Sequence, residues 1–396
     1  MRRINLKTAN VARPETIRLI NRQIVLNYVR ERAPISRAEI SQETALQRST
    51  ISLIVDELKD QGLLDETEGE STGGRPPILL RLRTAVPMAV GVDIGMERTV
   101  VATSDLAGRV LERQDFLTDP DQTKTLANVV KMAQQFISRH REIEGVGISL
   151  PGVIDPEAGL AHFIPHFKWR NWHIATEMHS MIGLPVNVDN DANAAALAEL
   201  WFGRPEIRDI RDFIMVLVHG GLGTGIVFDG QVYHGEIGAA GEFGHMTIGK
   251  DGPVDCASGS RECWEAFASE RAAVARYTGL VSRGRAGMNT TFSEIVELAL
   301  AGDESAIRAL IETAHYLAVG ISNLIKGLSP QAVIVGGSIT RAWPLINEQL
   351  RNSVEDSSIC SGLNQARIIP STLGQPTLMG AISLVLAGKF ASVQPA

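Results

Sequence analysis

The chain contains 396 residues, of which 44% are hydrophobic and 21% are charged, and its formal net charge is −7. This length is too great for one small hydrophobic core and predicts two or three domains. The apolar runs are well short of the ~20 residues that a transmembrane helix needs, the first residues lack the apolar core of a signal peptide, and three cysteines are too few for a disulfide framework. These features predict a globular protein of the reducing cytoplasm.

The charge is unevenly distributed. Residues 1–83 contain 14 Lys and Arg against 11 Asp and Glu, whereas the remaining residues contain 24 against 34. A basic N-terminal part suits contact with a phosphate backbone, which would repel the acidic remainder. A solvated basic tail would give the same charge, so charge alone does not distinguish such a tail from a DNA-binding domain.

Three helices are predicted before residue 62. Apolar residues at helical spacing indicate a first helix over residues 14–31, with an apolar face formed by Ile17, Ile20, Ile24 and Tyr28. Ser36 and Glu39 form a capping box that starts a short second helix. A third helix ends before Gly62, with an apolar face formed by Ile51, Ile54, Val55 and Leu58.

The third helix carries polar side chains that can enter a DNA major groove. They are Gln47, Arg48, Ser49, Thr50 and Ser52. Two β-prone runs follow within residues 63–82, and the turn between them places Arg75 before two prolines, where it can enter a minor groove. Residues 1–83 therefore predict a winged helix-turn-helix domain that binds operator DNA, with a three-helix protein-binding module as the alternative.

Two later segments share one pattern. Residues 89–111 and 212–234 each read as strand, glycine turn, strand, Asp-x-x-Gly or Asp-Gly turn, strand. Such a repeat indicates a duplicated α/β body with its ligand site between two lobes. We assign residues 84–210, completed by about 375–396, to the first lobe and residues 211–374 to the second. A structural duplication with an empty cleft is the alternative.

Polar groups gather where buried strands are predicted to end. One strand runs into Pro151 and Gly152, and another runs into Asn190 and Asp191 at the start of a helix. The carboxyl ends of strands are where α/β folds place their binding groups. Asp191 is suited to accept a proton or hydrogen bond from a sugar hydroxyl, although Asn190 and Asp191 would also serve as plain helix caps.

The segment from residue 218 to Glu265 combines four closely spaced glycines with Glu242 and His245. Glycine turns let a ligand approach the backbone closely, and carboxylate and imidazole groups can pair with vicinal hydroxyls. The segment therefore indicates a sugar site.

The chain resembles the ROK family, named for its repressors, open reading frames and kinases. The resemblance rests on the glycine-rich stretch ending at His245, on the Asn-Asp-Ala-Asn motif at residues 190–193, and on the winged helix domain that the repressor branch carries. It implies an α/β fold in which a two-lobed, actin-like and ribonuclease H-like body of the sugar kinase type follows the DNA-binding domain. It also implies that the sugar is bound by Pro151, Gly152, Asn190, Asp191, Glu242, His245 and Glu265. Trp169 and Trp172 could offer a flat apolar surface nearby.

The phosphate loop departs from that of the family's kinases, which read Asp-Ile-Gly-Gly-Thr-Lys. Here Met96 adds a side chain where phosphate must approach the backbone, and Glu97 adds a negative charge. For charges ~6 Å apart at an effective dielectric of ~20 the repulsion is roughly 3 kcal/mol, part of which Arg98 could offset. Gly220 also replaces a threonine of the second phosphate turn.

We therefore expect only a vestigial phosphate site, formed by Asp93, Gly95, Gly221, Gly223, Gly336 and Gly337. ATP is not an expected cofactor, and no residue is assigned a catalytic role. Asp191 would be the general base if the protein were a kinase.

The family's zinc motif is also incomplete. His245, Cys256 and Cys263 are present, but Ser258 stands where the family has a cysteine, and a neutral hydroxyl is a poor zinc ligand. Zinc completed by water or Asp255, and a metal-free loop, are the two alternatives.

These features predict a sugar-responsive transcriptional repressor that associates with the nucleoid when it binds DNA. A sugar or sugar phosphate would change lobe closure and so the spacing of the winged helices in a homodimer or homotetramer. The alternatives are a sugar kinase with an added DNA-binding domain and a repressor controlled by a protein partner.

Overall fold

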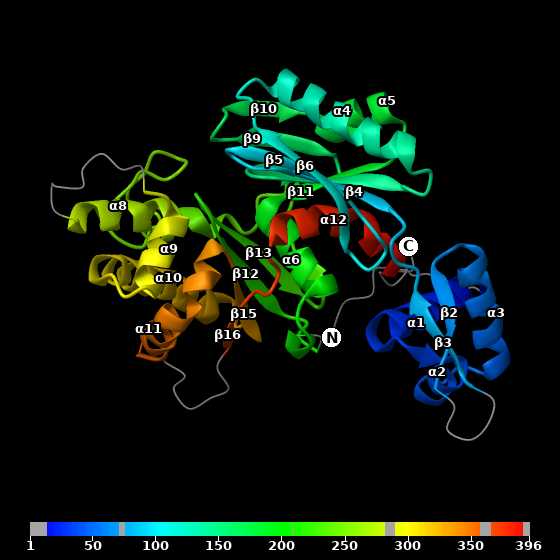
Figure 1. The fold of residues 1–396 in the computed structure, drawn as a ribbon. Coiled ribbons are helices and arrows are strands. Elements are labelled where there is room, and N and C mark those ends of the chain that lie inside the picture. The colour runs from blue at the N-terminus through cyan, green and yellow to red at the C-terminus, as the bar shows by residue number, and fades with distance from the viewer. Residues whose placement is uncertain (1–13, 71–75, 208, 282–289, 357–365, 391–396) are drawn as a thin grey trace.

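A computed structural model describes residues 14–70, 76–207, 209–281, 290–356 and 366–390. The predicted minor-groove residue Arg75 lies outside these residues. The chain forms a small N-terminal domain and a body of two α/β lobes (Figure 1).

The N-terminal domain is a winged helix-turn-helix. Its elements are α1 (Pro14–Arg32), β1 (Ile35–Ser36), α2 (Arg37–Glu43), α3 (Arg48–Asp60), β2 (Leu64–Glu68) and β3 (Ile78–Leu82). Strands β2 and β3 pair as the antiparallel wing, and β1 pairs with the other edge of β3. The predicted capping box is confirmed, because the Ser36 hydroxyl accepts the Glu39 N–H at 3.2 Å and the Glu39 carboxylate accepts the Ser36 N–H at 2.7 Å.

The predicted apolar face of α1 is confirmed only at Tyr28, which packs against the hydrophobic core. Val25, Leu26 and Val29 are the buried residues of this helix, whereas Ile17 is 48% exposed. The C-terminal half of α1 lies against α3, β3 and the last helix of the body, so contacts from two domains select the buried face. The spacing of apolar residues along the helix does not indicate those contacts.

The two lobes contain five-stranded sheets of the same design. The first, in the order β11-β7-β4-β5-β6, consists of β4 (Ala89–Ile94), β5 (Arg98–Ser104), β6 (Val110–Leu117), β7 (Gly145–Leu150) and β11 (Val186–Asn190). The second, in the order β14-β13-β12-β15-β16, consists of β12 (Phe213–Val218), β13 (Leu222–Phe228), β14 (Gln231–Val232), β15 (Ala332–Gly337) and β16 (Arg367–Pro370). In each sheet three antiparallel strands continue into two parallel ones, which confirms the predicted duplication.

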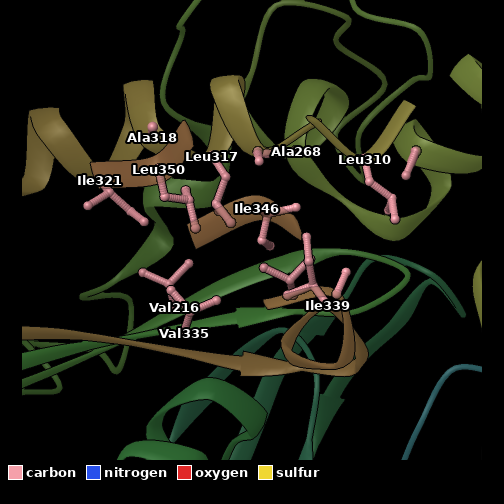
Figure 2. Packing of buried hydrophobic residues seen from close by; sticks show 14 of the residues in the cluster. Val216, Ala268, Leu310, Leu317, Ala318, Ile321, Val335, Ile339, Ile346 and Leu350 are labelled. Carbon is pink, nitrogen blue, oxygen red and sulfur yellow. The ribbon is translucent and has the colours of Figure 1, made fainter. Parts of the chain in front are cut away.

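Helices cover the outer faces of both sheets. The first lobe has α4 (Gln122–Arg139), α5 (Ile174–Ile182) and a small sheet of β8 (Val153–Asp155), β9 (Leu160–Ile164) and β10 (Trp169–Trp172). The second has α7 (Trp264–Ala268), α8 (Glu270–Leu280), α9 (Phe292–Leu300), α10 (Glu304–Leu328) and α11 (Trp343–Asp356), with 3₁₀ turns η1 (Pro205–Ile207), η2 (Glu242–His245) and η4 (Ser338–Ala342). Figure 2 shows Leu317 of α10 and Ile346 of α11 packed over Val216 and Val335 of the second sheet.

Two helices, α6 (Asp191–Phe202) and α12 (Pro376–Phe390), lie between the sheets (Figure 1). Helix α6 packs on β12 and β13 of the second lobe, and α12 packs on β4 and β7 of the first. They cross closely, because a Cβ at Gly380 would lie 2.3 Å from the Ala194 carbonyl oxygen. Helix α6 therefore begins at the cleft and contacts both lobes.

Candidate functional site

Asn190 holds the start of α6 together with the loop after β7. Its Oδ1 accepts the N–H groups of Ala192 (2.8 Å) and Asn193 (3.2 Å), and its Nδ2 donates to the Gly152 carbonyl at 2.9 Å. Gly152 has a φ of 102°, and a Cβ there would lie 2.3 Å from the Phe163 carbonyl oxygen. The helix cap considered as an alternative role for Asn190 is thus present, and the same side chain fixes the loop that contains Pro151.

Asp191 lies beside Asn190 in a region rich in carboxylates. Burial, with added repulsion from Asp93 and Glu242, raises the pKa of Asp191 to about 7. A carboxyl group in this range can either accept or donate a hydrogen bond near neutral pH, which suits recognition of a hydroxyl.

Asp93, at the end of β4, is held from two distant parts of the chain. Its carboxylate accepts hydrogen bonds from Ser149 (3.0 Å) and Thr377 (2.7 Å), and burial raises its pKa. The hydroxyl of Thr377 comes from α12. No local pattern around Asp93 indicates these two partners, which are 56 and 284 positions away from it in the chain.

The second lobe contributes Glu242 and His245 from η2. Gly241 precedes them with a φ of 88°, and its carbonyl accepts a hydrogen bond from Thr224 on β13. The Glu242 carboxylate lies 3.8 Å from His245 Nε2, and partial burial together with the charge of Glu265 raises the pKa of Glu242. The turn thus offers a carboxyl group and an imidazole to the cleft.

Glu265, on α7, is fixed by several donors. Its carboxylate accepts the N–H of Ala257 at 2.8 Å and that of Leu222 at 3.3 Å, and it pairs with Arg271 at 2.9 Å. Arg271 also donates to the Gly220 carbonyl at 2.6 Å. Sequence reasoning missed Arg271, which links the sugar-site carboxylate to the second phosphate turn.

A second missed contact joins the two lobes. His234, after β14, lies 2.8 Å from the buried carboxylate of Asp189 at the end of β11. Although burial opposes the charged form of His234, this hydrogen bond raises its pKa. Asp189 also accepts the N–H of Asn190 at 2.7 Å, so the contact orients the start of α6.

The expected role of the two tryptophans is wrong. Trp169 and Trp172 are only 6% and 1% exposed and belong to the core of the first lobe. Trp169 stacks on Phe167 and donates to the Pro120 carbonyl at 2.7 Å. Neither ring can present a face to a sugar, because both are buried in the core of the first lobe.

The two glycine turns predicted to form a vestigial phosphate site approach each other at Met96 and Gly220. A Cβ at Gly220 would lie 2.9 Å from Met96 Cε, so the Met96 side chain occupies the space where a threonine would stand. Gly221 lies close to Glu265, since a Cβ at Gly221 would lie 3.0 Å from Glu265 Oε2. Gly223 lies close to Asp191, since a Cβ at Gly223 would lie 3.7 Å from Asp191 Oδ1.

The expected offset of the Glu97 charge by Arg98 is wrong. Arg98 pairs with Asp115 on β6 at 2.8 Å and leaves Glu97 without that partner. Gly95 and Arg98 close the tight turn between β4 and β5, in which the Gly95 N–H donates to the Arg98 carbonyl at 3.0 Å. Arg98 begins β5, and the antiparallel register of β5 with β6 places Asp115 opposite Val100, two residues further along β5, so the strand pairing brings Arg98 and Asp115 together.

Gly336 and Gly337 end β15 beside a cavity of about 700 Å³. The cavity is lined by Glu97, Gly220, Glu270, Arg271, Phe292 and Ser338, among others. Burial raises the pKa of Glu270 to about 7, and repulsion from Glu97 contributes. Two carboxyl groups, those of Glu97 and Glu270, thus border this cavity.

The metal-site residues come together as a cluster of three. The ligand atoms of His245, Cys256 and Cys263 all lie within 4.8 Å of one another. The Ser258 hydroxyl lies 2.9 Å from Cys256 Sγ, on the side where the missing cysteine would stand. Asp255 is 71% exposed and lies 3.9 Å from Arg261, outside this cluster. An imidazole and two thiols are groups of the kind that bind zinc in proteins, and within the described residues they lie together without a third cysteine.

The described DNA-contact candidates lie at the start of α3. Gln47, Arg48 and Ser49 are exposed, whereas Thr50 and Ser52 are half-buried. Gln47 has the extended conformation of an N-cap but makes no side-chain capping bond.

Comparison with known proteins identifies the family. The ROK family profile matches residues 89–387. The chain belongs to the ROK family. The xylose repressor of Bacillus subtilis (strain 168) is 31% identical to this ROK protein over 386 residues, which cover 95% of this chain and 97% of the relative.

Solved structures agree on the fold. A ROK family transcriptional regulator, a homolog of the E. coli MLC protein, has a TM-score of 0.78 and 27% identity, and the match covers 96% of this ROK protein and 98% of that chain. A ROK family glucokinase from Streptomyces griseus, solved with glucose and AMPPNP, has a TM-score of 0.66 and 30% identity, covering 75% of this chain and 98% of the kinase. The predicted fold class is confirmed. Within the described residues, no helix is long and apolar enough to cross a membrane.

Proposed function

We infer that this ROK protein is a sugar-responsive transcriptional repressor, in which a monosaccharide binds between the lobes and the winged helix-turn-helix domain binds operator DNA. The observation that carries the proposal is the presence in one chain of a hydroxyl-binding cluster at the start of α6 and an exposed DNA-reading helix α3. The xylose repressor from B. subtilis, similar over nearly its whole length, supports it.

We propose that the effector is a neutral monosaccharide. The carboxyl groups of Asp93, Asp191, Glu242 and Glu265 surround the site; burial raises the pKa values of the first three, and repulsion from neighbouring carboxylates adds to the raised pKa of Asp191 and of Glu242. Such groups pair well with hydroxyls but repel a phosphate. A pentose or hexose therefore fits this site better than a sugar phosphate.

The test measures DNA affinity with and without sugar. A duplex selected by the full-length protein from a random pool is titrated by fluorescence anisotropy, alone and with pentoses, hexoses and their phosphates. We expect one neutral sugar to weaken DNA binding 5- to 150-fold, the usual range of allosteric coupling. If every sugar that binds leaves DNA affinity unchanged, the proposal is wrong. If calorimetry detects no sugar binding at all, control by a protein partner is favoured.

We also propose that this chain does not turn over ATP. Met96 occupies the space beside Gly220, Glu97 lacks Arg98 as a partner, and Glu270 adds a second carboxyl group near the phosphate seat. Phosphoryl transfer depends on positioning and charge stabilisation, so these changes oppose it. A coupled ADP-release assay across hexoses and pentoses tests this point, and sugar-dependent turnover that disappears in Asp191→Ala would establish a kinase instead.

Helix α6 provides a route between the sugar site and the DNA-binding domain. Its first residue is Asp191, and Trp201 lies in its last turn. The Arg30 guanidinium of α1 lies 4.7 Å from the Trp201 ring centroid and 4.9 Å from that of Phe390, and Asn27 donates to the Phe390 carbonyl at 2.8 Å. We propose that sugar binding displaces α6 as a rigid element and that this contact transmits the displacement to α1.

Removing the guanidinium tests this route. Arg30→Met retains the aliphatic stem but loses the cation–π contact. We expect the sugar affinity of the body to be unchanged and the effect of sugar on DNA affinity to fall toward none. Arg170→Met is the matched control, because Arg170 lies 3.9 Å from the Phe163 ring centroid within the first lobe. Undiminished sugar response in Arg30→Met would refute the route.

Two further features belong to the proposal. Recognition of paired half-sites requires a symmetric assembly, so we propose a homodimer or a homotetramer, which light scattering would distinguish from a monomer. We also propose that His245, Cys256 and Cys263 hold a structural zinc ion, which would fix the loop between η2 and α7.

A further inference from the structure

The outward face of α3 contains one exposed leucine. Leu53 is 72% exposed, whereas Ile51, Ile54 and Val55 of the same helix are at most 4% exposed. The other apolar residues of α3 are buried in the hydrophobic core of the domain. Sequence reasoning assigned only polar residues of α3 to DNA contact and passed over Leu53.

Leu53 occupies the centre of the face that a DNA groove would meet. At about 100° per residue, it points roughly opposite to Ile51. Ser49 lies one turn before it and Asp56 nearly one turn after it. Asp56 pairs with Arg37 of α2 at 2.8 Å and Glu57 pairs with Arg18 of α1 at 2.7 Å, so the carboxylates one turn after Leu53 are both paired with cations. Leu53 is therefore an apolar patch between short polar side chains, on the helix whose start carries Arg48.

The major groove offers one apolar feature that suits this patch. Thymine alone presents a C5-methyl group there, and apolar side chains recognise it by contact. Burying the leucine against that methyl removes both groups from water. Serine, by contrast, pairs with several bases and discriminates weakly.

We propose that Leu53 determines specificity for a thymine in each half-site through contact with its C5-methyl group. The inference rests on the proposed DNA-binding function. It makes a prediction that phosphate contacts do not make, because the contact involves no charge and should leave the salt dependence of binding unchanged.

The test replaces thymines by deoxyuridine, which lacks only the methyl group. The full-length protein selects a duplex from a random pool, and each thymine of that duplex is then replaced in turn. We expect one replacement per half-site to weaken binding about fourfold, the loss for one methyl-sized apolar group. Leu53→Ala should bind the thymine and deoxyuridine duplexes equally, with the same salt slope as the unmodified protein.

Leu117→Ala is the matched control, because Leu117 is 71% exposed on β6 of the first lobe, outside the DNA-binding domain. This variant should keep the full preference for thymine over deoxyuridine. If no replacement affects the unmodified protein, or if Leu53→Ala keeps the preference, this inference is overturned while sequence-specific binding still supports the proposed function. If no duplex is selected, both fail.

Discussion

Replacing Asp191 by asparagine should stabilise the protein while it removes a sugar contact. The pKa of Asp191 is raised from 3.8 to about 7, mainly by burial. In the unfolded chain the carboxyl group ionises near pH 4, so folding stability falls as pH rises from about 4 to about 7 and is constant above that. Asparagine has nearly the same shape and no charge, so Asp191→Asn should escape this loss.

The size of the stability gain is obtained by comparing the free energy of unfolding at two pH values. Between pH 5.5 and the folded pKa of about 7, a carboxyl group loses roughly 2 kcal/mol of stability at 1.36 kcal/mol per pH unit. Water in the cleft screens part of this, so we expect the advantage of Asp191→Asn to grow by about 1–2 kcal/mol between pH 5.5 and pH 8.5. Comparing two pH values cancels the hydrogen-bond changes that the substitution itself introduces.

Urea denaturation of both proteins at the two pH values measures this quantity. Asp60→Asn is the control, because it makes the same substitution at a carboxylate that is exposed at the end of α3. An Asp191→Asn advantage that is equal at pH 5.5 and pH 8.5 would refute the reasoning. Calorimetry on the Asp191→Asn variant should show weaker sugar binding. Residues that bind a ligand often lower the stability of the fold, so a substitution that stabilises the fold at such a residue often weakens ligand binding.

Three further changes probe other parts of the molecule. The proposed site of His245, Cys256 and Cys263 should hold about one zinc ion per chain by elemental analysis, and Ser258→Cys, which supplies the missing fourth ligand, should slow the removal of that ion by a chelator; protein that takes up no zinc in either form would count against the metal site. Gln47→Ser places a capping hydroxyl on an N-cap of suitable conformation and should stabilise the DNA-binding domain by about 0.5–1 kcal/mol, with no gain in thermal stability as the contrary result. Gly320→Ala puts a Cβ 1.9 Å from Trp264 and should destabilise the second lobe by about 1–3 kcal/mol, whereas Gly327→Ala in the same helix meets nothing within 4 Å and should not, so equal effects would contradict the packing argument.

The amino-acid sequence by itself determined the elements whose signals are local. The capping box of Ser36 and Glu39 spans four residues, and the cap formed by Asn190 acts on N–H groups two and three residues later. The two glycine-turn hairpins likewise carry their own turn residues, which is why the duplicated body could be predicted. In each case the interacting groups lie close together in the chain, so few other local conformations can compete with the one observed.

Only the tertiary structure decided which groups meet across the chain. It selected Val25 rather than Ile17 for burial in α1, buried Trp169 in the first lobe, and drew Arg98 to Asp115 rather than to Glu97. Periodicity shows that a helix has an apolar stripe, but the surface that covers the stripe comes from other elements. Contacts such as Arg30 with Trp201 depend on the packing of whole domains, because many pairings of distant residues are compatible with the same local pattern and the packed core permits one.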